Sequence, residues 1–446
     1  MIPRDTIAAI ATAPGRGGIG VVRVSGRDLM RFASALISKP LQPRRAVLTA
    51  FCDHAGDPID EGIALFFPAP HSYTGEDVIE LQGHGGPVVM RQLLQRCLEI
   101  GARLARPGEF TERAYLNGRM DLAQAEGVAD LIEASTALAA RAALRSLKGD
   151  FSELIQGLTS RIVALRTLLE ATLDFPEEEV EFLTAGRAAE QLTTIREQLD
   201  RVMASTQQGS LLREGIHAVL IGEPNVGKSS LLNRLAGEDV AIVTDVPGTT
   251  RDAVREQIDI DGLPVHIIDT AGLRETDDPV ERIGIRRTWT QIEKADLALV
   301  VSDAAGVDDS GQQGIINRLP AGLARIRVLN KIDLAERPFA REAQDNEDRV
   351  WVSAKTGAGL DLLKQAIWDR AGWHPSGEGL FSARARHTAA LQLAQAHLAR
   401  AAEQTRHLEL YAEELRLAHE ALCTITGEFT PDDLLGEIFS KFCIGK

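Results

Sequence analysis

The sequence has 446 residues, a formal net charge of −15, 44% hydrophobic residues and 25% charged residues. A chain of this length is expected to form about three domains at roughly 150 residues each, and its composition excludes a disordered or fibrous protein. Because the overall charge repels phosphate, a nucleic-acid partner must be met by a local basic patch or by a second protein. The composition therefore disfavours direct nucleic-acid binding without excluding it.

The cysteines and the apolar runs indicate the compartment. Cys52, Cys97, Cys423 and Cys443 have neither CxxC nor Cys/His ligand spacing, which argues against a disulfide framework and a zinc site. The first twenty residues are broken by Pro14 and several glycines, and no later run reaches about 18 apolar residues. We therefore expect a cytoplasmic protein with no membrane segment.

Residues 1 to 118 are predicted to form one compact mixed α/β domain. Short β-branched runs, such as 19 to 24 and 78 to 81, are separated there by Gly and Pro residues. Gly83, Gly85 and Gly86 lack the GK[ST] ending of a phosphate loop, so we expect them to permit close backbone packing.

Beyond residue 118, the composition and the apolar periodicity of the sequence change twice. Residues 119 to 214 and 376 to 446 are rich in Ala and Leu with apolar residues three and four apart, which predicts amphipathic helices. Residues 215 to 375 alternate apolar strands with helices, which predicts a parallel sheet covered by helices. The predicted strands are 216 to 221, 265 to 268, 297 to 301, 326 to 329 and 350 to 352. We predict a multidomain α/β plus all-α fold in which one discontinuous helical domain holds the strand-rich segment as an insert; two unrelated helical pieces are the alternative.

A phosphate-binding loop follows the first strand of that insert. The run from Gly222 to Ser229, GEPNVGKS, matches G-x-x-x-x-G-K-S and precedes a helical stretch. The glycines let successive amides point at phosphate oxygens, and Lys228 neutralises the β- and γ-phosphates. The Ser229 hydroxyl is a hard oxygen ligand suited to Mg²⁺.

Three further motifs follow in the order that a GTP-binding domain requires. Asp269-Thr270-Ala271-Gly272 ends a strand, where the carboxylate reaches Mg²⁺ through a water and the Gly272 amide meets the γ-phosphate. In Asn330-Lys331-Ile332-Asp333, the carboxylate of Asp333 can accept two hydrogen bonds from guanine that adenine cannot donate. Ser353-Ala354-Lys355 supplies the amide that reads guanine O6. Residues 215 to 375 are therefore predicted to form an inserted Ras-like P-loop G domain.

The segment from Thr244 to Asp252, TDVPGTTRD, is too polar for a core strand and lies where the switch over the γ-phosphate must lie. Thr250 is predicted as the second protein ligand of Mg²⁺. The predicted GTP contacts are Asn225, Val226, Gly227, Lys228, Ser229, Ser230, Thr244, Asp245, Val246, Pro247, Gly248, Thr249, Thr250, Asp269, Thr270, Ala271, Gly272, Asn330, Lys331, Asp333, Ser353, Ala354 and Lys355.

Leu273 stands where Ras-like enzymes carry the Gln that orients the attacking water. A carboxylate from residues 275 to 285 is the natural replacement, and an exposed acidic residue at a helix start is the alternative for any one of them. Charge that develops between the β- and γ-phosphates must also be stabilised. Asn225 and neighbouring switch carbonyls can hold a monovalent cation such as K⁺ at that position.

Motifs near both ends of the chain add a resemblance. DTIAAIATAPGRGGIGVVRVSG, VIELQGHGG and LNGRMDLAQAE lie in the first 126 residues, and the chain finishes with Cys443-Ile444-Gly445-Lys446. Together with the G-domain motifs, they resemble the MnmE (TrmE) family of tRNA modification GTPases, of the TrmE-Era-EngA-like group, along essentially the whole length.

The resemblance implies a homodimer that forms a heterotetramer with the FAD-dependent protein MnmG. The implied product is a carboxymethylaminomethyl group on C5 of the wobble uridine, position 34, of certain tRNAs. The one-carbon unit is implied to come from a tetrahydrofolate derivative, 5-formyl or 5,10-methylene, held by the N-terminal domain, which also serves dimerisation. The family's potassium site falls on Asn225, Thr244, Val246 and Thr249, and its catalytic carboxylate falls on Glu281.

The implied folate contacts are Arg23, Glu80, Arg119 and Lys446. Arg or Lys can clamp the glutamate tail of folate and Glu80 can accept from the pterin N–H edge, while the plain alternative for each is a solvated charge. Arg119 stands where the family often has Lys, which keeps the charge but not the geometry. Cys443 is implied to be a reactive thiol in the tRNA chemistry, and an inert cysteine is the alternative.

A second class of function is a GTP-dependent switch in ribosome assembly. No KH-like GXXG segment and no basic tail follows the G domain, and an acidic chain suits an RNA-binding partner better than direct capture of rRNA. The state of the wobble uridines in cells separates the two functions.

Overall fold

The structure is a computed structural model that divides into two compact units. The first comprises Met1–Ala129, Phe151–Val163 and Leu415–Lys446, and the second comprises Asp130–Asp150 and Ala164–Glu414. The structure describes residues 5 to 174, 185 to 236, 254 to 269, 286, 288 to 306, 313 to 335, 337 to 344, 347 to 374, 379 to 428, 432 to 440, 442 and 445.

The first unit contains a six-stranded sheet of order β3-β4-β5-β2-β1-β6. Its strands are β1 (Ile7–Ile10), β2 (Gly17–Gly26), β3 (Val47–Cys52), β4 (Pro58–Phe67), β5 (Asp77–Gly85) and β6 (Arg103–Leu104). All neighbours pair antiparallel except β1 and β6, which pair parallel. The predicted runs 19 to 24 and 78 to 81 lie inside β2 and β5, so both strand predictions are confirmed.

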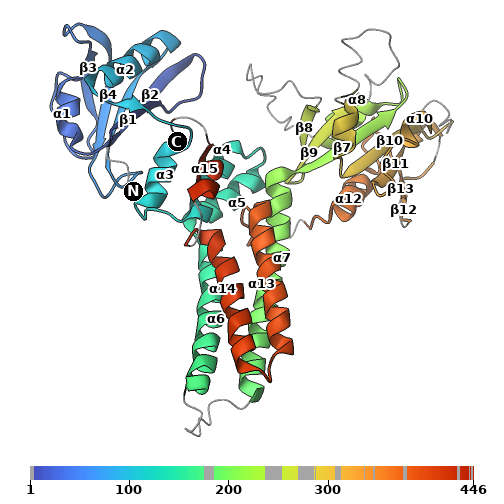
Figure 1. The fold of residues 1–446 in the computed structure, drawn as a ribbon. Helices are drawn as coiled ribbons and strands as arrows, with labels where there is room; N and C mark the ends of the chain where they lie inside the picture. Colours follow the sequence, from blue (N-terminus) through green and yellow to red (C-terminus); the bar gives the residue numbers. More distant parts are fainter. Residues whose placement is uncertain are drawn as a thin grey trace. The chain divides into compact units, whose positions relative to one another are not determined.

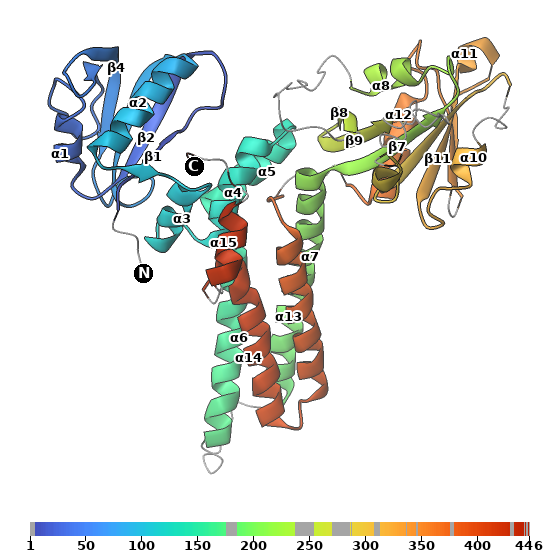
Figure 2. The same ribbon diagram turned by 45° about the horizontal axis from the view of Figure 1, so that its top comes forward.

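Helix α2 (Pro87–Ile100) covers this sheet (Figures 1 and 2). Pro87 suits the first helical position, where no amide partner is needed, and Gly101 ends the helix at φ 120°. Met90, Leu93 and Cys97 are buried in one apolar cluster with residues of β2 and β5, including Val22 and Leu81. The spacing of these helical residues, three and four apart, therefore produces the contact with the sheet.

Two of the three glycines at the end of β5, Gly83 and Gly85 within the strand and Gly86 just after it, pack as expected. A Cβ on Gly83 would lie 2.5 Å from Asp60 Oδ2, and one on Gly85 would lie 2.6 Å from the Gly17 carbonyl oxygen. At Gly86 a Cβ would meet nothing within 4 Å, so the packing prediction is wrong for this residue.

The first unit also holds the end of the chain. Its helices are α1 (Leu29–Ser34), α3 (Glu109–Leu116) and α15 (Asp432–Ser440), with parts of α4 (Leu122–Glu133), α6 (Asp150–Asp174) and α14 (Leu408–Thr426). Leu122 and Ala125 share an apolar cluster with Phe439 and Phe442, so α15 packs on α4. The Tyr115 hydroxyl donates to the Gly427 carbonyl at 2.6 Å, which joins α3 to the same region.

The second unit contains a seven-stranded sheet of order β12-β13-β11-β10-β7-β9-β8. Its strands are β7 (Ile216–Gly222), β8 (Val254–Ile260), β9 (Leu263–Asp269), β10 (Leu297–Asp303), β11 (Ala324–Asn330), β12 (Ala340–Glu342) and β13 (Glu347–Trp351). The five predicted strands are β7, β9, β10, β11 and β13, and they pair parallel. The sheet is nevertheless mixed, because β8 and β12 add antiparallel edges that the sequence analysis did not anticipate.

The helices of the second unit form two groups. Around the sheet lie α8 (Lys228–Ala236), α10 (Gln313–Ile316), α11 (Ile332–Ala335) and α12 (Leu360–Ala371), and the remaining helices are α5 (Ala137–Lys148), α7 (Ala185–Glu214) and α13 (Ala385–Glu403). Helices α7 and α13 lie side by side although the sheet separates them in sequence (Figures 1 and 2), and Gln395 Nε2 donates to Asp200 Oδ1 at 2.7 Å. This packing confirms the discontinuous helical domain with its inserted G domain.

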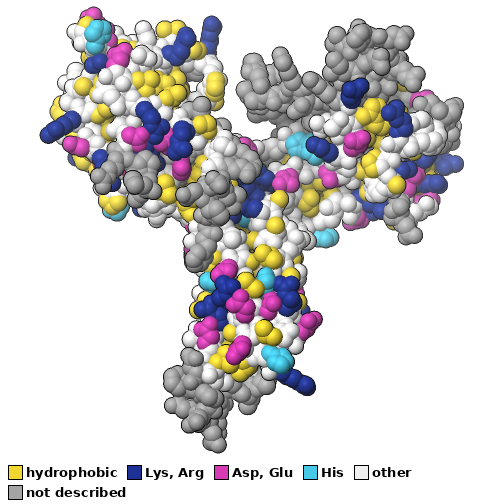
Figure 3. Space-filling model, in the orientation of Figure 1, with side chains coloured by type: hydrophobic (Ala, Val, Ile, Leu, Met, Phe, Trp, Pro, Cys, Tyr) yellow, Lys and Arg dark blue, Asp and Glu magenta, His cyan; other side chains and the backbone are white. Residues whose placement is uncertain are grey.

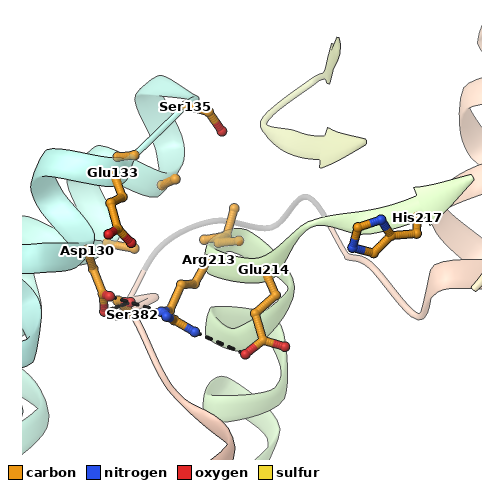
Figure 4. Close-up of a pocket in the computed structure, with 11 residues that line it drawn as sticks. Asp130, Glu133, Ser135, Arg213, Glu214, His217 and Ser382 are labelled. Atoms are coloured by element: carbon orange, nitrogen blue, oxygen red, sulfur yellow. Dashed lines mark hydrogen bonds and ion pairs between the residues drawn. The ribbon is translucent and has the colours of Figure 1, made fainter. Parts of the chain in front are cut away.

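The two chain segments that border the insert meet at Asp130. Its Oδ1 accepts from Arg213 Nε at 2.9 Å and from Arg384 Nη2 at 2.7 Å, and its Oδ2 accepts from Ser382 Oγ at 2.5 Å. Figure 4 shows Asp130, Arg213 and Ser382 beside a cavity of about 330 Å³, with Arg213 bridging Asp130 and Glu214. Asp130 is buried, so this network fixes where the chain enters and leaves the sheet domain.

On the helical part, basic and acidic side chains lie next to one another (Figure 3). Glu414 accepts from both His397 Nδ1 at 2.7 Å and Arg400 Nε at 3.1 Å, and Arg416 pairs with Glu420. An exposed pair such as Arg416 with Glu420 contributes little free energy. None of the helices that the structure describes is long and apolar enough to cross a bilayer.

A buried charge cluster stabilises the first unit. Arg113 and Glu109 are both fully buried, and Arg113 Nη2 donates to Glu109 Oε1 at 3.0 Å. Glu109 also accepts from Arg103 Nη1 at 2.8 Å and from the Arg106 amide at 2.9 Å. Burial alone raises the pKa of Glu109, but hydrogen bonds from Arg103, Arg106 and Arg113 outweigh it and lower the pKa to about 2.

This lowered pKa predicts a pH-dependent stability. A carboxyl whose pKa is lower in the folded than in the unfolded state contributes stability above its unfolded pKa and loses it as the pH falls toward the folded pKa. The free energy of unfolding should therefore fall with pH between about pH 5 and pH 2. Glu109→Gln should flatten this dependence, as followed by urea denaturation across that range. Parallel pH profiles for the variant and the wild type would contradict the assignment.

Candidate functional site

The predicted phosphate loop lies between the end of β7 and the start of α8. Lys228 Nζ donates to the carbonyl oxygens of Gly222 and Glu223, at 2.7 and 2.9 Å. The ammonium at the end of the loop is therefore held by the backbone at its start. Asn225 and Gly227 adopt positive φ values of 67° and 94°. This conformation turns successive amides toward one side, as a phosphate-binding loop requires.

Position 227 must be a glycine because Asn330, of the 330–333 motif, packs directly against it. A Cβ there would lie 2.4 Å from Asn330 Nδ2, which is closer than any side chain can approach. The Asn330 amide nitrogen instead donates to the Val226 carbonyl at 2.8 Å. Its Oδ1 accepts from the Ala354 amide at 3.0 Å. Asn330 therefore joins the phosphate loop to both predicted guanine motifs.

Asp333 is held by Ser353, the first residue of the 353–355 motif. Ser353 Oγ donates to Asp333 Oδ1 at 2.6 Å and accepts from the Thr356 amide at 3.1 Å. Ser353 is buried, so the carboxylate is fixed from the protein side. An oriented carboxylate at this edge of the sheet is suited to two parallel N–H donors, which guanine provides. Lys355 is exposed in the turn that follows.

Several predicted site residues lie outside the described part of the chain. They are Thr244, Asp245, Val246, Pro247, Gly248, Thr249, Thr250, Thr270, Ala271, Gly272, Glu281, Cys443 and Lys446. Asp269 ends β9, beside Leu220 of β7, but its side chain is not described. The roles of all of these residues stay predictions.

In the first unit, Arg23 and Glu80 form a directly paired couple. They are register partners on β2 and β5, and Glu80 Oε1 accepts from Arg23 Nε and Nη2 at 3.0 and 2.9 Å. The Arg23 guanidinium lies 5.3 Å from the ring centre of Tyr73 and 5.8 Å from that of Phe110. The sequence analysis assigned Arg23 and Glu80 separate contacts and missed this pairing and the two aromatic neighbours, because strand register and ring contacts are tertiary features.

One further segment reaches this couple, and another reaches the loop that carries Tyr73. Arg23 Nη1 donates to the Gly445 carbonyl at 3.4 Å, which places Gly445 beside β2. Asn117 Nδ2 donates to the Thr74 carbonyl at 2.7 Å, and a Cβ on Gly75 would lie 3.2 Å from Arg119 Cγ. Arg119 therefore lies against the loop that carries Tyr73, and its side chain is exposed. The structure therefore brings Arg23, Glu80 and the Gly445 carbonyl together, and Arg119 lies against the neighbouring loop.

Sequence comparisons assign the chain to a family. The model of the MnmE helical domain matches residues 122–443, and the model of the GTP-binding protein TrmE N-terminus matches residues 6–119. The tRNA modification GTPase MnmE of Azoarcus sp. is 61% identical over 445 residues, covering 100% of this chain and 98% of the relative. The protein of the same name from Nitrosomonas europaea is 58% identical over 451 residues, covering 100% of both chains.

A comparison with solved structures finds partial matches. A structure of Era in complex with MgGDPNP and 16S ribosomal RNA is 28% identical, covering 41% of this chain and 66% of that chain at a TM-score of 0.27. This score is too low to carry weight. The full-length identities and the two domain matches show that the chain belongs to the MnmE (TrmE) family of tRNA modification GTPases.

Proposed function

We propose that this GTPase acts in the cytoplasm on tRNA, as a K⁺-stimulated homodimer together with an FAD-dependent partner of the MnmG type. The product is a carboxymethylaminomethyl group at C5 of the wobble uridine of certain tRNAs. The observation that carries this proposal is 61% identity over the whole chain to a relative named as a tRNA modification GTPase. The same observation disfavours the alternative role in ribosome assembly.

The nucleotide chemistry divides among a few residues. Lys228, fixed over its loop by two carbonyls, neutralises phosphate charge, and Ser229 at the start of α8 offers its hydroxyl to Mg²⁺. Asp333, oriented by Ser353, selects guanine. Thr250 is the proposed second Mg²⁺ ligand. The bound Mg²⁺ supplies charge stabilisation between the β- and γ-phosphates.

The proposed K⁺ site uses Asn225 with Thr244, Val246 and Thr249. Asn225 is held at φ 67° within the phosphate loop, where a neutral amide oxygen is a suitable ligand for a monovalent cation. The cation takes the place of an arginine finger, and Glu281 takes the place of the water-orienting Gln. In this proposal the G domains pair across the dimer and so order the two switch segments.

The folate site is proposed at the Arg23–Glu80 couple with Arg119 and Lys446. A folate carries both a glutamate tail, suited to Arg and Lys, and a pterin edge of N–H donors, suited to Glu80. The contact between Arg23 and the Gly445 carbonyl supports a site that includes the end of the chain. It also supports a role for Cys443, two residues away, in the tRNA chemistry.

The cation proposal predicts faster GTP hydrolysis in KCl than in NaCl at matched ionic strength. Asn225→Ala should lower the rate in KCl toward the NaCl rate, because it removes one ligand of the cation. Initial rates of phosphate release at saturating GTP measure both effects. Equal wild-type rates in the two salts would overturn the proposal.

The tRNA proposal predicts a specific chemical loss in cells. Mass spectrometry of tRNA nucleosides from cells without the gene should lack the carboxymethylaminomethyl group on wobble uridine. The wild-type gene should restore the group, Arg23→Ala should not, and the control Arg106→Ala, an exposed arginine of the same domain, should. An unchanged nucleoside profile in the deletion strain would reject the function, and restoration by Arg23→Ala would reject the folate site.

A further inference from the structure

An ion pair at the edge of the G-domain sheet has no assigned role. Asp303 is the last residue of β10 and is the register partner of Asn330, the last residue of β11. Lys331 follows Asn330 directly. Because the parallel strands end together, Asp303 and Lys331 meet, and Lys331 Nζ donates to Asp303 Oδ2 at 2.9 Å.

The Asp303 carboxylate is oriented by a backbone amide as well as by Lys331. Asp303 Oδ1 accepts from the Ala305 amide at 3.0 Å, and the Ala304 amide donates to the Asn330 carbonyl at 2.8 Å. The hydrogen bond from Ala305, and then that from Lys331, lower the pKa of Asp303, so the group is a carboxylate at neutral pH. One oxygen is thus used to orient the side chain and the other to bind Lys331.

Stability does not account for this arrangement. The side chains of Lys331 and Asp303 are 30% and 31% exposed, and ion pairs with that exposure contribute little to the free energy of unfolding. Lys331 also adopts a φ of 65°, which is unfavourable for a residue with a Cβ. Unfavourable backbone held by surrounding contacts is typical of functional sites.

The neighbours of Lys331 indicate what it serves. Asn330 is hydrogen-bonded to the phosphate loop and to Ala354, and Asp333 is hydrogen-bonded to Ser353. Lys331 therefore lies in sequence between two residues of the base site whose side chains are fixed. Between its Cα and the ammonium that Asp303 holds, Lys331 has a stem of four methylene groups. Such a stem presents an apolar surface, which suits the flat face of a purine.

We propose that Asp303 is a positioning residue that holds the stem of Lys331 against the guanine base of GTP and GDP. Asp303 does not touch the nucleotide. It neutralises the ammonium and removes the freedom of a long side chain, so that less freedom is lost when the base binds. The inference rests on guanine-nucleotide binding and is independent of the tRNA chemistry.

Asp303→Asn tests this inference, because it keeps the acceptor for the Ala305 amide and removes the charge that binds Lys331. The dissociation constants of GDP and of a non-hydrolysable GTP analogue should rise by the same factor, about tenfold. The KM for GTP should rise while kcat holds, and Asp303→Glu should recover most of the affinity. Asp303→Asn added to Lys331→Met should cause no further loss.

The matched control is Asp261→Asn. Asp261 forms an exposed ion pair with Lys364 at 3.1 Å in the same domain, and its loss should leave nucleotide binding unchanged. Wild-type GDP affinity in Asp303→Asn would overturn the inference. A loss confined to the GTP analogue, or a full additional loss in the Lys331→Met background, would overturn it as well.

Discussion

The side-chain amide of Asn330 is the interaction on which the nucleotide site depends. It is almost completely buried, and it donates to the Val226 carbonyl while accepting from the Ala354 amide. Three loops are thereby fixed to one another, with the phosphate loop 104 residues and Ala354 24 residues away from Asn330 in sequence, and Gly227 is needed to leave room for the amide. Without the amide, a buried carbonyl and a buried N–H would lose their partners, at a cost of about 1–3 kcal/mol each.

The other contacts of the site involve residues next to those that Asn330 joins. Ser353, next to Ala354, orients Asp333, and Asp303, which precedes Asn330 in sequence, holds Lys331. Each functional side chain is therefore held by a residue of a different loop. A site organised in this way is formed before the nucleotide arrives, which reduces the free energy that binding must spend on ordering.

The first unit follows the same principle with charged groups. The Arg23 guanidinium lies over the rings of Tyr73 and Phe110, and Phe110 follows the buried Glu109 directly in sequence. The cluster of Glu109, Arg103 and Arg113 thus supports the helix that carries one wall of the proposed folate site. The Gly445 carbonyl accepts a hydrogen bond from Arg23, so one hydrogen bond again joins residues that are far apart in the sequence.

The sequence was sufficient to predict features that local motifs encode. The phosphate loop, the guanine motifs and the five parallel strands follow from residue types at fixed spacing, and the discontinuous helical domain follows from matching apolar periods. The antiparallel edges β8 and β12 were missed because β12 has only three residues and the sequence of β8, VREQIDI, alternates apolar and polar residues only near its end. The pairing of Arg23 with Glu80 and of Asp303 with Lys331 depends on strand register, which only the folded sheet defines.

The selectivity of the nucleotide site depends on the reading of guanine by Asp333, which fixed side chains hold at this edge of the sheet. The nucleotide preference of Asp333→Asn tests it most directly, because an Asn keeps an acceptor for the N1 proton and replaces the second acceptor with a donor that suits the C2 carbonyl of xanthine. Dissociation constants for GDP and XDP, measured on wild type and variant, should show a shift of preference from guanine to xanthine. An unaltered preference for GDP in the variant would contradict the account.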